Sequence, residues 1–78
     1  MNDLIMNNTY NKLQHDIKFL IDHISIKTPN TAKLLIDTHF EIYKLEGERA
    51  IKELRKFRTH LKTMCKGVII PEYKPDLE

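Results

Sequence analysis

Apolar residues in the first third of the chain recur at alternating steps of four and three. They fall at Met6, Tyr10, Leu13, Ile17, Leu20 and Ile24, with Ile21 widening the stripe. This spacing places apolar side chains on one helix face, as in a coiled-coil seam. It predicts a helix over about residues 8–26, with Asn7 or Asn8 as the N-cap.

A helix boundary follows at Lys27-Thr28-Pro29-Asn30. Thr28 is placed to be an N-cap, and Pro29 suits the first helical position, where its missing N–H would be unpaired anyway. The residue before a proline also avoids helical geometry. The first helix is therefore expected to end here, and a second to begin after a tight turn.

A second apolar seam continues from this boundary, again in steps of four and three. It runs through Ile36, Phe40, Tyr43, Gly47, Ala50, Leu54, Phe57, Leu61, Met64 and Val68. Gly47 is the one position without an apolar side chain, and inside a helix it costs about 1 kcal/mol relative to alanine.

Two all-α architectures fit this seam. If Gly47 breaks the chain, three short helices form a bundle. If it does not, one helix of about residues 30–66 extends for about 55 Å and pairs with the first as an antiparallel hairpin. We favour the long helix because the register continues across Gly47. Either way, residues 1–66 form the helical domain and residues 67–78 an extended C-terminal tail.

The favoured hairpin leaves half of the long helix without a partner. Exposed apolar stripes of that size mark association. The sequence therefore predicts a homodimer or a larger helical assembly. Its expected interface consists of Ala50, Leu54, Phe57, Leu61 and Met64.

The tail contains two prolines and cannot continue the helix. Gly67 is placed to be the left-handed residue that ends the preceding helix. Ile69, Ile70 and Tyr73 are the expected anchors of an arm that docks on a surface or a partner. The alternative is a frayed terminus.

Positive charge is concentrated in one element. Between Arg49 and Lys66 there are seven basic residues and one acid, Glu53, whereas the whole chain has a net charge of +2. Most of these cations fall opposite the apolar seam, with Arg58 at the edge, and suit contact with phosphates. We call six of them the basic face: Arg49, Lys52, Arg55, Lys56, Lys62 and Lys66. The alternatives are a solvated surface or a site for an acidic protein.

Nothing in the sequence indicates catalysis. The four histidines form no i, i+4 pair and none has a ligand spacing to Cys65, so no metal site is expected. His39 and Cys65 fit packing roles better than chemical ones. There is no glycine-rich phosphate loop and no nucleophile elbow. We expect no enzyme activity, no cofactor and no small-molecule substrate.

Location is expected to be cytoplasmic, or intracellular and virion-associated. No apolar run is long enough for a membrane helix, and residues 1–6 lack the basic region and apolar core of a secretory signal. A single cysteine fits a reducing compartment. Lysine outnumbers arginine ten to three, a composition typical of AT-rich genomes such as those of many phages.

The stretch from Lys44 to Leu54 resembles the central motif of the small bacterial and phage histone-like nucleoproteins, Lys-x-x-Gly-x-Arg-Ala-x-Lys-x-Leu. The matching positions are Lys44, Gly47, Arg49, Ala50, Lys52 and Leu54. The resemblance implies DNA binding and compaction through a helical hairpin. The family's Gly-Asn turn is absent, and an acidic arm replaces the lysine-rich tail of some members.

Three functions follow from these patterns. The leading hypothesis is a nucleic-acid-associated protein that contacts the phosphate backbone with its basic face and reads no bases. The second is a structural or adaptor subunit that uses the seam and the tail for protein contacts. The third is a small inhibitor that docks on an acidic enzyme surface.

Overall fold

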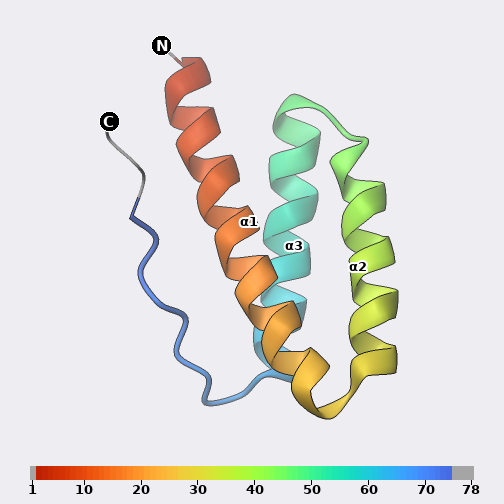
Figure 1. The fold of residues 1–78 in the computed structure, drawn as a ribbon. Helices are drawn as coiled ribbons and strands as arrows, with labels where there is room; N and C mark the ends of the chain where they lie inside the picture. The colour runs from red at the N-terminus through yellow and green to blue at the C-terminus, as the bar shows by residue number, and fades with distance from the viewer. Residues whose placement is uncertain (1, 75–78) are drawn as a thin grey trace.

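Three helices form the fold in a computed structural model, which describes the backbone of residues 2–74 and the side chains of residues 8–74. They are α1 (Asn2–Lys27), α2 (Pro29–Tyr43) and α3 (Gly47–Met64). The helices run down, up and down in a bundle (Figure 1). The all-α prediction and its three-helix alternative are confirmed. The favoured continuous helix over about residues 30–66 is wrong, because the chain turns between Tyr43 and Gly47.

The break depends on backbone geometry near Gly47. The N–H groups of Lys44 and Leu45 donate to carbonyls three residues back, those of Glu41 and Ile42, which tightens the last turn of α2. Gly47 then has a φ of 62°, a left-handed conformation that glycine adopts without steric cost. Apart from its chain neighbours and the adjoining helix backbone, no atom of the described structure lies within 4 Å of the place where a Cβ at Gly47 would sit. The glycine therefore serves the turn and not a close helix crossing.

The break also separates the registers of α2 and α3. In α3, Ala50, Leu54, Phe57 and Leu61 are buried along the expected seam. In α2, the buried side chains are Ala32, Leu35 and His39. The predicted seam residues of α2, Ile36, Phe40 and Tyr43, are 42%, 61% and 46% exposed. An intervening turn lets each helix rotate independently, so the continuous seam was misleading for α2.

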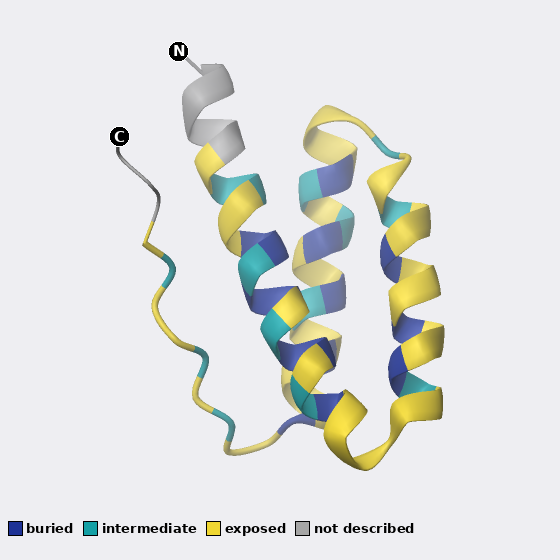
Figure 2. Ribbon diagram, in the orientation of Figure 1, coloured by how far each residue is buried: buried dark blue, intermediate teal, exposed yellow. Residues whose placement is uncertain are grey.

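Helix α1 supplies the largest share of the core and contacts both other helices. Leu13, Ile17, Leu20 and Ile24 are buried on its inner face, as predicted (Figure 2). The helix begins at Asn2, so the predicted N-cap at Asn7 or Asn8 is wrong. Asparagine is a weak helix former but does not interrupt backbone hydrogen bonding.

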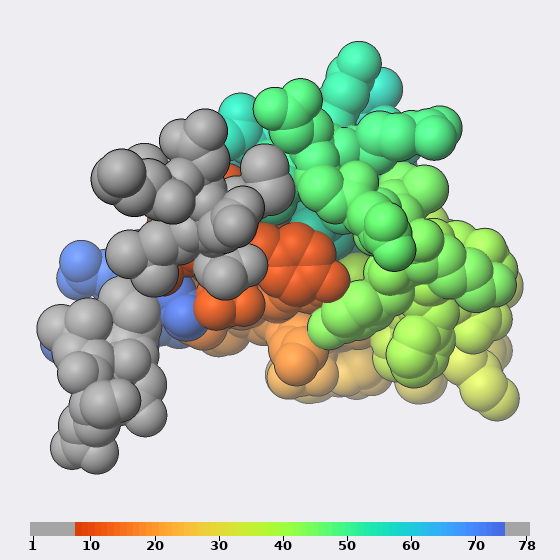
Figure 3. Space-filling model, turned by 90° about the horizontal axis from the view of Figure 1, so that it is seen from above, coloured from red at the N-terminus to blue at the C-terminus, as the bar shows by residue number. Residues whose placement is uncertain are grey.

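The α1–α2 boundary lies where the Thr28-Pro29 pair predicted it. Pro29 opens α2, but the Thr28 hydroxyl makes no cap to that helix. It donates instead to the carbonyl of Ile24, 3.1 Å away, and so closes the end of α1. At the opposite end of the bundle, seen from above in Figure 3, α1 meets the end of α2. There the Tyr10 and Tyr43 rings pack edge to face at 6.3 Å.

The tail leaves α3 through a turn over residues 65–67, in which Gly67 has a φ of 83°. Its left-handed conformation is as predicted. The tail then runs back beside α1 (Figure 1). Val68 and Ile70 are partly buried against the core, and the Tyr73 ring lies 5.4 Å from that of His15. Ile69 is 87% exposed and does not dock. The described part of the tail thus rests on its own bundle.

Candidate nucleic-acid interface

The basic face lies on the outer side of α3. All six of its side chains are exposed, five on the helix and Lys66 in the turn that follows it. The buried side chains of α3 point the opposite way, into the bundle. The distance along the helix axis from Arg49 to Lys62 is about 20 Å, at 1.5 Å per residue. The cations thus form one elongated surface.

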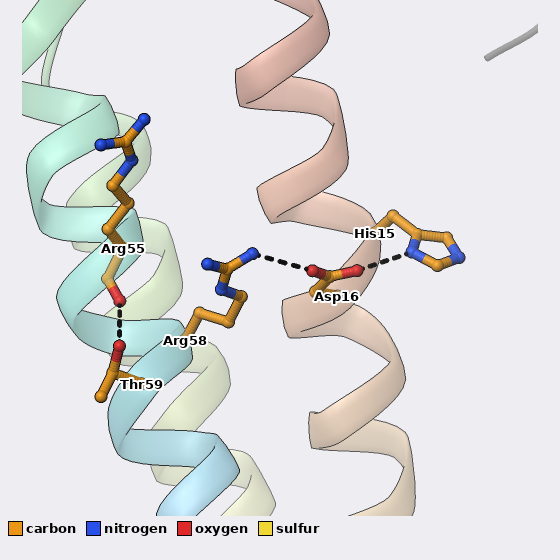
Figure 4. A network of polar contacts seen from close by, with 5 residues as sticks. All are labelled: His15, Asp16, Arg55, Arg58 and Thr59. Atoms are coloured by element: carbon orange, nitrogen blue, oxygen red, sulfur yellow. Dashed lines mark hydrogen bonds and ion pairs between the residues drawn. The ribbon is translucent and has the colours of Figure 1, made fainter. Parts of the chain in front are cut away.

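Most of these cations have no acidic partner among residues 8–74. Within residues 8–74, the basic face has a single ion pair, between Lys56 Nζ and Glu53 Oε2 at 3.5 Å. Both of these side chains are solvent-accessible, so the pair contributes little to stability. The Arg55 guanidinium lies apart from Asp16 on α1 and does not point toward it (Figure 4). Only the main-chain carbonyl of Arg55 is engaged there, by the Thr59 hydroxyl at 3.0 Å.

Arg58 has a different role from the basic face. Its Nη1 donates to Asp16 Oδ2 on α1 at 3.1 Å, and His15 Nδ1 donates to Asp16 Oδ1 at 3.0 Å (Figure 4). The side chain of Asp16 is 7% exposed and that of Arg58 is 27% exposed. A charge pair at this depth joins α1 to α3, so Arg58 is committed to the fold.

The burial of Asp16 was not predicted from the sequence. The sequence contained an indication of this burial, because Asp16 lies three residues after Leu13 and four before Leu20, next to the apolar face of α1. A carboxylate there must be paired when the helix packs. Its partner could not be identified from the sequence, since Arg58 lies 42 residues away and two other arginines are close by.

The expected oligomer interface lies mostly inside the chain. Ala50, Leu54, Phe57 and Leu61 are between 0% and 7% exposed, covered by the chain's own helices. Met64 is 44% exposed. The seam was expected to be bare because a long helix would outrun its partner. The chain instead turns before Gly47, and α2 folds back into the bundle. These four core residues are therefore not available for contact with a second copy of the chain.

A second polar cluster is buried between α1 and α2. His39 Nε2 and Gln14 Oε1 are hydrogen-bonded, and because an amide oxygen only accepts, Nε2 carries the proton. Burial, with a smaller contribution from nearby Lys18, lowers the pKa of His39 below its usual value of 6.5. His39 is therefore neutral in the fold at pH 7, in agreement with its expected packing role.

We expect the free energy of unfolding to fall as the pH drops below about 6.5, the unfolded-state pKa of histidine. The unfolded chain then binds a proton that folded His39 resists, and the loss levels off below the folded pKa. Urea unfolding at pH 7.5 and pH 5 measures it. His39→Gln should reduce this pH dependence, whereas His60→Gln, at an exposed position, should retain it. Equal pH dependence in both variants would contradict this assignment.

Reactive groups are scarce in the described structure. Cys65 is buried, and burial raises the pKa of its thiol, which disfavours the nucleophilic thiolate. Within residues 8–74, no three acidic, histidine or cysteine side chains are grouped to hold a metal ion. None of the helices over residues 2–64 combines the length and apolar character that a membrane crossing needs.

No protein-family model, curated protein or solved structure matches this chain. The resemblance of residues 44–54 to histone-like nucleoproteins stays a prediction. The structure assigns the chain to the class of small three-helix bundles.

Proposed function

We propose that this protein associates with nucleic acids and contacts their phosphate backbone, without base recognition, through the basic face of α3. The observation that carries the proposal is the row of exposed cations, five of which have no ion pair within residues 8–74. A solvated helix face normally interleaves acids with bases, and here Glu53 is the only acid between Arg49 and Lys66.

The dimensions support backbone contact. A duplex strand carries one phosphate per 3.4 Å of helix axis, so the span of about 20 Å between Arg49 and Lys62 passes about six phosphates. Lysine and arginine on a straight helix can reach several of them at once. The exposed face of α3 offers threonines between its cations and no asparagine or glutamine. The groups that commonly read adenine are thus missing from α3.

Binding to random-sequence duplex DNA is expected to weaken steeply with salt. With four to five phosphates neutralised, the slope of log affinity against log salt concentration should be about −4, because each contact releases condensed counterions. Affinity should therefore fall about 250-fold between 50 and 200 mM salt. Fluorescence anisotropy with a labelled duplex measures both quantities, and a matched single strand compares the two forms. No binding at 50 mM salt to either form would refute the proposal.

A second function, as a subunit of a protein assembly, is favoured by one specific observation. Ile36, Phe40 and Tyr43 form an apolar row on α2 that the bundle leaves about half exposed. We call this row the α2 stripe. The expected tail anchors Ile70 and Tyr73 do not support this function, since they lie against the chain's own bundle. The two functions use different helices and are compatible with each other.

A further inference from the structure

The α2 stripe forms one wall of a groove between α1 and α2. The groove has a volume of about 520 Å³. It is lined by Lys18, Ile21, Asp22, Ile36, His39, Phe40 and Tyr43. No residue of α3 lines it, so the groove and the basic face belong to different surfaces.

The floor of the groove is buried by the bundle, whereas its apolar walls are exposed to solvent. Ile21 and His39 are only 5% and 7% exposed, because the bundle already packs them. Phe40 is 61% exposed, and its ring centroid lies 6.4 Å from that of Tyr43. Spacing by four and three residues along α2 is that of a helix-packing face. The groove therefore has the form of a half-built helix–helix contact.

The two charges of the groove indicate what covers it. Lys18 and Asp22 lie one turn apart on α1, and neither makes an ion pair within residues 8–74. A nucleic acid would meet Asp22 and an apolar wall, and a strongly charged protein would find one of the two charges repulsive. A two-fold contact satisfies both, because residue i then meets residue j of the other copy and the reverse.

We propose that the groove binds a second copy of this chain, with the two α1–α2 faces antiparallel about a two-fold axis. Lys18 pairs with the partner's Asp22, and Ile36 packs on the partner's Phe40. Both pairs join residues four positions apart, which is about 6 Å along a helix. The two-fold axis repeats each pair on its other side.

This inference rests on the assembly function and is independent of nucleic-acid binding. The dimer it describes carries the basic faces of both copies away from the contact, since α3 contributes nothing to the groove. Self-association through another surface would preserve the assembly function while refuting these contacts.

Sedimentation equilibrium without nucleic acid tests the dimer. When the concentration of wild-type protein is raised to about 500 μM, a dimer should become measurable. A weak dimer of this kind is what a small interface is expected to give. Lys18→Asp and Asp22→Lys should each weaken dimerisation by about tenfold or more, because each creates two like-charge pairs across the axis. The double variant Lys18→Asp/Asp22→Lys should restore dimerisation to within about threefold of wild type, since it exchanges the two charges.

Controls cover the fold and the apolar contact. Phe40→Ser should weaken the dimer, whereas Ile26→Ser, at a position 79% exposed outside the groove, should not. Circular dichroism checks that each variant keeps its helices. A wild-type monomer at about 500 μM refutes the proposal. So does a wild-type dimer that tolerates either single reversal, or a double variant as weak as the single ones.

Discussion

Replacing Asp16 with leucine is expected to lower the free energy of unfolding by about 3 kcal/mol. The substitution leaves the Arg58 guanidinium at the α1–α3 contact without its carboxylate. The arginine retains some solvent contact, at 27% exposure, which places the cost at the lower end of the range for buried pairs. Native proteins have a total free energy of unfolding of only about 5–15 kcal/mol, so this loss would be a large fraction of the stability measured by urea denaturation.

A double variant separates the loss of the pair from the loss of packing. Asp16→Leu/Arg58→Met removes both charges and should recover most of the lost stability, because apolar residues can replace a buried ion pair with little net cost. Asp37→Ala, at an exposed aspartate of α2, should stay within about 0.5 kcal/mol of wild type. If Asp16→Leu also lost no more than about 0.5 kcal/mol, the Asp16–Arg58 pair would behave as a surface ion pair, and the prediction would be wrong.

Reversing two charges on the basic face should abolish most of the nucleic-acid binding. We expect Arg55→Glu/Lys62→Glu to weaken duplex binding at 50 mM salt by about 200-fold. At this salt concentration each phosphate contact increases the affinity by about 15-fold, and the variant removes two contacts. The salt slope should become shallower by about two. Both residues are exposed and without ion pairs within residues 8–74, and glutamate is as good a helix former as lysine or arginine. The fold should therefore persist.

A matched variant controls for net charge. Lys12→Glu/Lys33→Glu changes the net charge by the same amount, at exposed positions on α1 and α2. It should bind duplex DNA within a few fold of wild type, because it leaves the phosphate contacts intact. Equal losses in the two variants would show that overall charge, and not the basic face, controls binding. Anisotropy titrations on the same duplex compare them directly.

The helical class, the inner face of α1 and the inner face of α3 were predictable from the sequence. Residues such as Leu13, Ile17, Leu54 and Leu61 are buried because a period near 3.6 places them on one side of a helix, and this is a local property. The boundary at Pro29 was also local, since proline restricts both its own backbone and that of the residue before it. The exposure of the basic face followed from its position opposite the seam.

The register of α2 could not be predicted in the same way. Gly47 is compatible with either a helix or a left-handed turn, and the energy difference is only about 1 kcal/mol. Packing of α2 against α1 decides between them, and it buries Leu35 and His39 while leaving Phe40 exposed. The exposed α2 stripe, and with it the proposed self-association groove, follows from this choice.

Local periodicity by itself determined that the chain is helical and where its cations gather, because both depend on residues a few positions apart. Only the tertiary structure decided that α2 folds back against α1, that Arg58 pairs with Asp16 and that Lys18 and Asp22 border an apolar groove. These features join residues far apart in the sequence. Their energies depend on which helix faces meet, and the hydrophobic pattern of one helix does not contain that information.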